Sequence, residues 1–347
     1  MTQTNKTNRQ WVLAERPKGE PTKDTLNLIE EAIPVASGNQ MLLRTEFLSL
    51  DPYMRGRMSD APSYAVPVEI GEVMVGSTVA QVVDSNIDGF TPGDYVLSFN
   101  GWQDYALSDG AGLTNLGKSP LHPSWALGIL GMPGFTAWAG LKQIGEPKAG
   151  ETIAVAAATG PVGATVGQIG KLMGCRVVGI AGGAEKCAYA VDELGFDACI
   201  DHKAGDFADQ LAKASPDGID VYFESVGGKV FDAVIPLLNP KARIPLCGLV
   251  SQYNATGLPA GPDRMNWLMG QILRKKIKLQ GFIIFDDFGY LYPDFAKEMG
   301  GWVESGKIKY REENIEGLEN ALHAFIGLLN GENFGKRVIH VGQQIKV

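Results

Sequence analysis

The stretch that decides the fold is ETIAVAAATGPVGATVGQIGKLMGC, residues 151–175. It begins as a short apolar strand that runs to Ala158, turns through Thr159 and Gly160, and enters a helix at Pro161. Proline suits the first helical turn because its missing N–H would be unpaired there anyway. Four glycines recur at helical spacing along one face: Gly163, Gly167, Gly170 and Gly174. Since a glycine in a helix interior costs about 0.5–1 kcal/mol relative to alanine, these positions indicate close approach, to a pyrophosphate at the N-terminal end of the helix and to the sheet further along.

The strand-to-helix turn follows the dinucleotide-binding pattern G-x-G-x-x-G, with Ala158 in place of the first glycine. Gly160 and Gly163 occupy the second and third glycine positions. A helix N-terminus offers unpaired N–H groups and the positive end of its dipole to a diphosphate. A second strand ends near Ala181, as a βαβ unit requires. We therefore predict that this part of the chain binds a dinucleotide.

The stretch IAGGAEK, residues 180–186, indicates which dinucleotide is bound. An NAD site places an acid at the end of the second strand to bind the adenosine ribose, and that acid would repel a 2′-phosphate. Here the position holds Ala181, Gly182 and Gly183, which leave space and carry no charge. Lys186, about one helical turn further on, can bring an ammonium to a phosphate. The predicted cofactor is NADP(H).

The pattern of elements divides the chain in two. From about residue 11 to 116, short strands alternate with turn signals, which is typical of an all-β unit. From about residue 125, strands alternate with helix-length segments, which predicts a parallel sheet covered by helices. The tail returns to strand at GKRVIHVG (335–342) and is predicted to complete the first unit. We expect a mainly β domain formed by 1–125 with 312–347 and a Rossmann-type domain formed by 126–311.

Length and composition limit the classes of function. The chain has 347 residues, 45% hydrophobic and 20% charged, which is typical of a globular protein of about two domains. Its net charge of −8 disfavours binding to nucleic acids and anionic membranes. The polar start MTQTNKTNRQ resembles no signal peptide, and no stretch is typical of a membrane span. We therefore expect a cytoplasmic protein that acts on small molecules.

Eight motifs in order along the chain resemble one family: SLDPYMRGRM (49–58), GMPGFTAWAGL (131–141), AAATGPVG (156–163), AGGAEK (181–186), GIDVYFESVGG (218–228), CGLVSQYN (247–254), LQGFII (279–284) and NFGKRV (333–338). The family is the zinc-independent branch of the medium-chain dehydrogenase/reductase superfamily. Within it, the sequence is most similar to leukotriene/prostaglandin reductases, plant 2-alkenal reductases and bacterial NADPH-dependent curcumin reductases. The resemblance implies a GroES-like catalytic domain beside the Rossmann domain.

The resemblance also implies positions for the cofactor site. The diphosphate loop falls on Gly160, Pro161, Val162 and Gly163, and the 2′-phosphate lysine on Lys186. His202 stands where a tyrosine often backs the same phosphate. The remaining implied cofactor contacts are Ser225, Cys247, Gly248, Tyr253, Phe282, Ile283, Ile284 and Asn333.

No metal is expected in the catalytic site. Zinc-dependent relatives need a cysteine near the start of the catalytic domain, whereas no cysteine precedes Cys175 in this chain. The four cysteines stand singly, and no two have metal-ligand spacing. Without a Lewis acid, an activated alkene is easier to reduce than a simple carbonyl. Hydride can add to the β-carbon of an enone, charge then develops on the carbonyl oxygen, and a hydrogen-bond donor must stabilise it.

Two tyrosines are candidates for that donor. Tyr53 lies in DPYMRG, which matches the substrate-pocket motif of the family, and Tyr64 follows in a proline-flanked loop. Each could instead be a structural aromatic residue whose hydroxyl is satisfied internally. The motif favours the donor role for Tyr53, whereas nothing decides between the two roles for Tyr64. Arg55 and Arg57 could orient an acidic substrate or pair with Asp51.

The expected function is NADPH-dependent reduction of the carbon–carbon double bond of bulky apolar enones and 2-alkenals, curcumin-like diketones among them. An NADPH quinone oxidoreductase is the alternative within the enzymes. A non-catalytic NADPH-binding sensor or moonlighting protein is the alternative outside them. The resemblance further implies a homodimer, in which an exposed edge at IKLQGFII (277–284) pairs with its symmetry mate.

Overall fold

The structure is a computed structural model that describes residues 7–259 and 261–342. The chain divides into two compact units, Met1–Gly128 with Glu312–Val347 and Ile129–Arg311. Each unit has its own sheet and hydrophobic core. No helix within the described ranges is long and apolar enough to span a bilayer.

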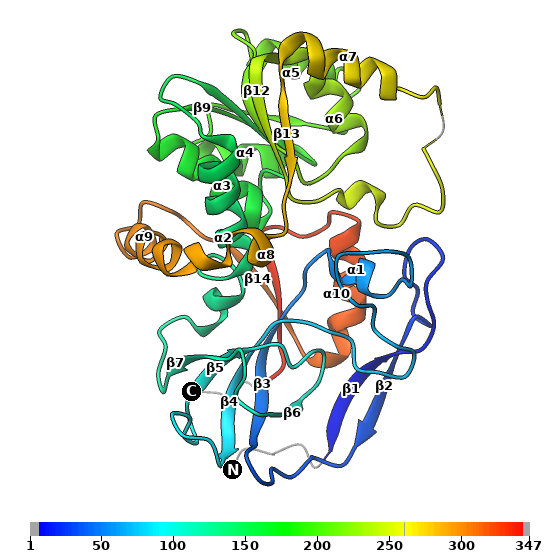
Figure 1. Cartoon of the computed structure of the whole chain (residues 1–347), viewed down its shortest axis with the longest axis vertical. Coiled ribbons are helices and arrows are strands. Elements are labelled where there is room, and N and C mark those ends of the chain that lie inside the picture. Colours follow the sequence, from blue (N-terminus) through cyan, green and yellow to red (C-terminus); the bar gives the residue numbers. More distant parts are fainter. Residues whose placement is uncertain (1–6, 260, 343–347) are drawn as a thin grey trace. The chain divides into compact units, whose positions relative to one another are not determined.

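The second unit is built on a six-stranded parallel sheet (Figure 1). Its strands are β8 (Thr152–Val155), β9 (Arg176–Ala181), β10 (Ala198–Asp201), β11 (Ile219–Phe223), β12 (Leu238–Leu246) and β13 (Lys278–Gly281). Their order is β10-β9-β8-β11-β12-β13, and every pair is parallel. In order along the unit this is 3-2-1-4-5-6, the arrangement of dinucleotide-binding sheets, whose switch point lies beside β8. The predicted doubly wound parallel sheet is confirmed.

Helices cover both faces of this sheet. The helices of this unit are α2 (Met132–Ala139), α3 (Pro161–Leu172), α4 (Ala184–Asp192), α5 (Phe207–Ala214), α6 (Gly228–Val234), α7 (Met265–Lys275), α8 (Ile284–Phe288) and α9 (Tyr292–Glu304). Of these, α8 and α9 pack against α2. Ala154 and Val178 join one core with Leu211 of α5 and Val234 of α6. Their strand neighbours face the opposite way, since a side chain at Gly170 of α3 would contact Ile153 and Val177. Two-faced burial explains why these strands are almost continuously apolar.

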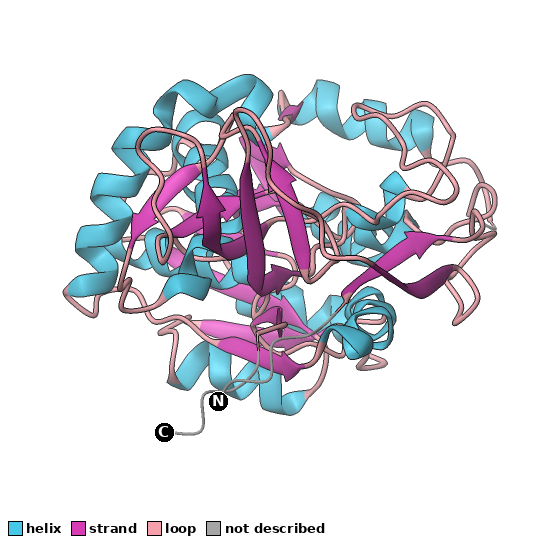
Figure 2. Cartoon of the chain, turned by 90° about the horizontal axis from the view of Figure 1, so that it is seen from below, coloured by secondary structure: helices cyan, strands magenta, loops and turns pink. Residues whose placement is uncertain are grey.

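The first unit contains a mainly antiparallel sheet in the order β14-β15-β3-β4-β5-β7, with β6 also paired to β3. These strands are β3 (Met41–Ser49), β4 (Thr78–Ser85), β5 (Tyr95–Ser98), β6 (Tyr105–Ser108), β7 (Thr114–Gly117), β14 (Glu312–Glu316) and β15 (Lys336–His340), shown among the magenta arrows of Figure 2. A hairpin of β1 (Asn8–Leu13) and β2 (Leu26–Glu31), helix α1 (Met54–Arg57) and helix α10 (Ala321–Leu329) complete the unit. The tail strand β15 pairs with β3, as a discontinuous unit requires.

One buried ion pair ties the tail to the start of this unit. Lys336 on β15 is 1% exposed, and its Nζ lies 2.6 Å from Oδ1 of Asp51. The ammonium also donates to the Leu50 carbonyl at 2.9 Å, and the Ser49 hydroxyl hydrogen-bonds the other Asp51 oxygen. The charges are therefore paired and hydrogen-bonded, as buried charges must be. This network holds the segment that carries Tyr53 against the sheet.

The decisive turn differs from its prediction in one respect. Helix α3 begins at Pro161 as predicted, but β8 ends at Val155, three residues before the predicted end at Ala158. Ala157 has φ +47°, in the left-handed region, which ends the extended conformation. A run of alanines gives no sign of that change in conformation. The strand predicted from the sequence was therefore too long.

The glycine face of α3 yields a stability prediction. A Cβ at Gly167 would lie 1.9 Å from Cζ of the buried Phe196 ring. We expect Gly167→Ala to lower the free energy of unfolding by about 1–3 kcal/mol through overpacking, measured by urea denaturation. Gly301→Ala is the matched control, because Gly301 also lies within a helix but has nothing within 4 Å of the added Cβ. That control should gain up to about 1 kcal/mol. Equal effects of the two substitutions would contradict the close packing.

Candidate functional site

The turn between β8 and α3 is shaped by close backbone approach. Gly160 is the N-cap of α3 and supplies no side-chain hydrogen bond to the helix N-terminus, and Pro161 is the first helical residue. A Cβ at Gly163 would lie 2.4 Å from the Ala157 carbonyl oxygen, so only glycine fits there. Val162, between them, is partly buried. The helix therefore presents its first N–H groups, without a side-chain cap, at the carboxyl end of β8.

The neighbouring strand ends in two glycines, and an added Cβ at Gly183 would have nothing within 4 Å. β9 ends at Ala181, and Gly183 (φ +98°) turns the chain into α4. Lys186 is the third residue of α4, in its first turn. A Cβ at Gly182 would lie 3.1 Å from Nε2 of His202 and 3.3 Å from Cε of Lys203. The structure thus places His202 beside the glycines, as the resemblance implies.

Two cations near the end of β9 were not predicted from the sequence. Lys203 lies directly against Gly182, and the charge of Lys229 on α6 acts on His202. Burial, followed by Lys229, lowers the pKa of His202, so the imidazole is neutral at pH 7 and donates or accepts without charge. Its Nδ1 is buried with no hydrogen-bond partner in the part of the chain that the structure describes. A small anion is the group that this arrangement fits.

Lys203 had a signal in the sequence, because it directly follows His202 in the stretch DHK. Lys229 had none, since it lies on α6, which packs in one core with α5, the helix that follows His202. One acidic residue, Asp201, also lies here, but its carboxylate already accepts hydrogen bonds from the backbone. Asp201 Oδ1 accepts the backbone N–H groups of Gly183 and Lys203 at 2.9 Å each, and these bonds lower its pKa.

The other half of the predicted cofactor site follows β11 and β12. Glu224 is fully buried, and its carboxylate accepts the N–H groups of Val226 and Gly227 and the Tyr222 hydroxyl. Those bonds fix the turn that carries Ser225, whose carbonyl accepts the N–H of Val250 at 3.0 Å. Burial raises the pKa of Glu224. The role of this side chain is to stabilise the turn through its hydrogen bonds.

The segment after β12 packs closely on that turn. The Cys247 N–H donates to the Glu224 carbonyl at 3.0 Å, and burial raises the pKa of the Cys247 thiol to about 12, so it is no nucleophile at pH 7. A Cβ at Gly248 would lie 3.0 Å from the Tyr253 hydroxyl, which accepts the Leu249 N–H at 3.4 Å. Ser225, Cys247, Gly248 and Tyr253 are therefore neighbours within this unit.

Phe282, Ile283 and Ile284 lead from β13 into α8. The Phe282 N–H donates to Leu246 at 3.2 Å, and the Ile283 N–H donates to the Asp287 carboxylate at 2.8 Å. Phe282 and Ile284 are buried. Their amide donors are thus partly engaged within the unit, which limits the backbone contacts that they can offer to a ligand.

Tyr53, in the first unit, precedes α1 and packs against the core beside Met54. The side chain of Ser77 hydrogen-bonds its hydroxyl. Burial, reinforced by the charge of Asp51, raises the pKa of Tyr53, so the phenol stays protonated through the physiological range. A protonated hydroxyl donates a hydrogen bond and holds its proton, which suits the stabilisation of a developing oxyanion.

The groups around Tyr53 have different roles. Tyr64 is 61% exposed, yet its hydroxyl influences the pKa of Tyr53, as does the charge of Arg57. Arg55 donates to the backbone carbonyls of Pro17 and Gly19, so it supports the fold. Asp51 pairs with Lys336 rather than with either arginine, and Arg57 Nε is buried without a hydrogen-bond partner among the described residues.

Asn333 donates to the Gly335 carbonyl within its own turn, and its cofactor contact stays a prediction.

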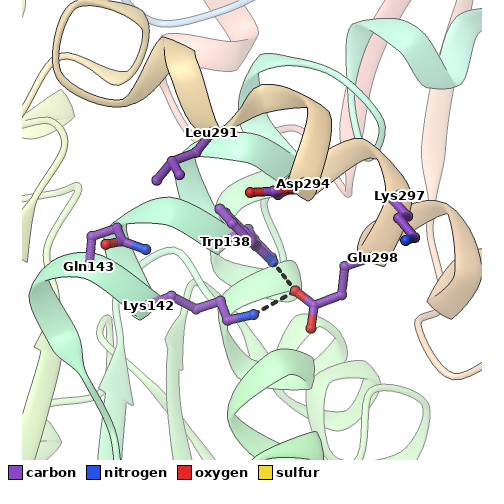
Figure 3. Close-up of a pocket in the computed structure, with 7 residues that line it drawn as sticks. All are labelled: Trp138, Lys142, Gln143, Leu291, Asp294, Lys297 and Glu298. Carbon is purple, nitrogen blue, oxygen red and sulfur yellow. Dashed lines mark hydrogen bonds and ion pairs between the residues drawn. The ribbon is translucent and has the colours of Figure 1, made fainter.

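A separate surface hollow lies in the second unit (Figure 3). It is lined by Trp138, Lys142, Gln143, Leu291, Asp294, Lys297 and Glu298. One Glu298 oxygen accepts both from Trp138 Nε1 and from Lys142 Nζ, at 2.5 Å each, and Lys142 lies over the Trp138 ring. These polar groups satisfy one another, and none of the lining residues belongs to the predicted site.

No cluster of three or more His, Cys, Asp or Glu side chains suited to a metal ion occurs in residues 7–259 and 261–342.

Comparisons with known proteins add independent findings. Residues 9–116 match the family described as the N-terminal domain of oxidoreductase, and residues 161–300 match the family described as zinc-binding dehydrogenase.

Relatives match over almost the whole chain. The NADPH-dependent curcumin reductase of Escherichia coli (strain K12) is 63% identical over 341 residues, which are 98% of this chain and 99% of that protein. Prostaglandin reductase 1 of Mus musculus is 40% identical over 338 residues, which are 95% of this chain and 98% of that protein. The crystal structure of CurA from Vibrio vulnificus in complex with NADPH is 64% identical, with a TM-score of 0.95, covering 97% of this chain and 100% of that one.

Proposed function

This chain belongs to the medium-chain dehydrogenase/reductase superfamily, in the branch of the curcumin, prostaglandin and 2-alkenal reductases, and from that membership we propose its reaction. The protein reduces the carbon–carbon double bond of α,β-unsaturated ketones and aldehydes with NADPH. Hydride adds to the β-carbon, and the α-carbon is protonated. The observation that carries the proposal is 63% identity to a curcumin reductase over 98% of the chain.

The cofactor site is proposed on the arrangement of the second unit. When bound, NADPH supplies the hydride. Gly160, Pro161, Val162 and Gly163 would face the diphosphate with the N–H groups of α3, and Lys186, His202 and Lys203 would hold the 2′-phosphate. Ser225, Cys247, Gly248 and Tyr253 would contact the nicotinamide half, with Phe282, Ile283, Ile284 and Asn333 as further contacts. The open space at Gly183, where an added Cβ would have nothing within 4 Å, supports the phosphate assignment, as do His202 and Lys203 beside Gly182.

The substrate-side roles are proposed on the first unit. We assign the catalytic domain to 1–125 with 312–347 and the NADP-binding domain to 126–311. Tyr53 would donate a hydrogen bond to the substrate carbonyl oxygen as charge develops on it. Tyr64 is the second candidate donor, since its hydroxyl acts on that of Tyr53. The α-carbon would take its proton from water, a hydroxyl of the protein or the cofactor ribose.

The proposed reaction is tested by following NADPH oxidation with an enal, curcumin and a quinone in parallel, and by identifying each product. We expect saturated carbonyl products from the enal and from curcumin, and far slower reaction with NADH. Activity confined to the quinone would favour a quinone oxidoreductase. Tight NADPH binding without turnover of any substrate would favour a sensor or moonlighting protein.

Removal of Lys186 should discriminate between the two nicotinamide cofactors. We expect Lys186→Ala to raise the Kd for NADPH roughly tenfold, about 1.4 kcal/mol, and to leave the Kd for NADH nearly unchanged. Isothermal titration measures both. Lys213→Ala, which removes an exposed lysine of α5, is the control. Equal weakening of NADPH and NADH by Lys186→Ala would contradict the phosphate role.

Removal of the Tyr53 hydroxyl should affect turnover alone. We expect Tyr53→Phe to lower kcat roughly a hundredfold, because an oxyanion donor is lost, while the Kd for NADPH stays unchanged. Steady-state kinetics and titration measure the two effects. Tyr95→Phe, at another partly buried tyrosine of the same unit, is the control. Unchanged kcat in Tyr53→Phe would transfer the donor role to Tyr64 or to the cofactor ribose.

A cytoplasmic homodimer is proposed as the working state. Free thiols at all four cysteines suit a reducing compartment, which a fractionation of cells assayed for the reductase would test. β13 is the edge strand of its sheet, its residues are exposed, and one side of α7 exposes Met265, Met269 and Leu273. An unpaired edge beside exposed apolar side chains is suited to pairing with a second copy.

The dimer is tested by light scattering after size exclusion. We expect a mass of about twice the 37.2 kDa of one chain, and a shift toward one chain mass in Leu273→Asp. Leu121→Asp, at a leucine that is 87% exposed in the other unit, should leave the mass unchanged. A single-chain mass for the unmodified protein would refute the dimer.

A further inference from the structure

Two cysteines lie side by side next to the proposed 2′-phosphate site. Cys187 is the fourth residue of α4, directly after Lys186, and Cys199 is the second residue of β10, three before His202. Their thiols hydrogen-bond each other. Both residues are only partly buried, so small reagents can reach the pair.

The sheet is shaped to admit the Cys199 sulfur. Cys199 pairs with Gly179 across the parallel β9–β10 ladder. A Cβ at Gly179 would lie 3.1 Å from Cys199 Sγ, so the absence of a side chain there leaves room for the sulfur on this face. The Cys199 thiol meets that of Cys187 of α4. The remaining two cysteines have other neighbours: Cys175 donates to the Lys148 carbonyl, and Cys247 to the Glu224 carbonyl.

The two thiols are chemically different. The hydrogen bond from Cys199 lowers the pKa of Cys187, whereas the same contact and burial raise the pKa of Cys199. Cys187 also lies in the first turn of α4, where the helix dipole favours a negative charge. Cys187 is therefore the nucleophile of the pair, and Cys199 is placed to react with it in a second step.

We propose that Cys187 and Cys199 form a reversible disulfide on exposure to a hydroperoxide, and that this bond weakens NADPH binding. The Cys187 thiolate attacks the terminal peroxide oxygen, the O–O bond breaks, and an alcohol leaves as Cys187 becomes a sulfenic acid. The Cys199 sulfur then loses its proton and attacks Cys187 Sγ, and the S–O bond breaks to release water. Two thiols are oxidised, and one hydroperoxide is reduced to an alcohol and water.

The effect on the cofactor follows from the movement that the bond requires. Hydrogen-bonded sulfurs must approach by more than about 1 Å to reach the disulfide length of about 2.05 Å. That approach pulls the first turn of α4, which carries Lys186, toward β10. Lys186 and His202 then leave the arrangement that holds the phosphate. This second half of the proposal rests on the proposed NADPH-dependent function, whereas disulfide formation does not.

The test treats the full-length protein, free of cofactor, with tert-butyl hydroperoxide, alkylates the remaining thiols, and maps peptides without reduction. We expect a cross-linked peptide pair containing Cys187 and Cys199, loss of two hydrogens from the intact mass, and reversal by dithiothreitol. Cys187→Ser and Cys199→Ser should each abolish the cross-link, whereas Cys175→Ser should keep it. Cys187 and Cys199 that stay free, or that oxidise singly, would overturn the proposal.

Titration of the oxidised protein tests the coupling. We expect the Kd for NADPH to rise about tenfold, the Kd for NADH to stay unchanged, and the rise for NADPH to vanish in Cys187→Ser. An oxidised protein with unchanged NADPH affinity would overturn the coupling but not the disulfide. A reduced protein that fails to bind NADPH would overturn the proposed function, while the cross-link would still be read independently.

Discussion

The structure of the second unit depends on one steric constraint, the approach of α3 to the end of β8. At Gly163 a Cβ would lie 2.4 Å from one carbonyl oxygen and 2.8 Å from a second, those of Ala157 and Ala156. Further along the helix, a Cβ at Gly167 would clash with Phe196, and a Cβ at Gly170 would lie too close to Ile153. Because the helix lies so close, its N-terminus is held at the switch point of the sheet, where a diphosphate can be bound. The glycines that weaken α3 as an isolated helix make it a binding element in the fold.

Local chemistry explains what the sequence could predict of the fold. Strand and helix periods, the proline at the start of α3 and the glycine spacing are properties of neighbouring residues, and the sheet class and the start of α3 followed from them. The end of β8 did not, because it depends on the left-handed Ala157, and alanine carries no signal for that conformation. The partner of Asp51 was also hidden. The sequence offered nearby arginines, whereas the fold brings Lys336 from the far end of the chain.

In the cofactor region, too, some residues could be predicted from neighbouring sequence and others could not. The missing acid and Lys186 could be recognised because they lie in one continuous stretch. Lys203 was overlooked beside His202, and Lys229 becomes a neighbour only because α6 packs with α5. The close pair of Cys187 and Cys199 depends on packing of α4 against β10, so cysteine spacing alone indicated four single thiols. Proximity of this kind follows from topology and not from the local sequence.

The central claim is that hydride reaches the β-carbon of an enone and leaves its carbonyl intact. The most direct measurement uses NADPH deuterated at the transferred position of C4, with a 2-alkenal as substrate and NMR of the isolated product. We expect deuterium on the β-carbon of a saturated aldehyde. Deuterium on a carbinol carbon, with the double bond retained, would show carbonyl reduction and refute reduction of the double bond.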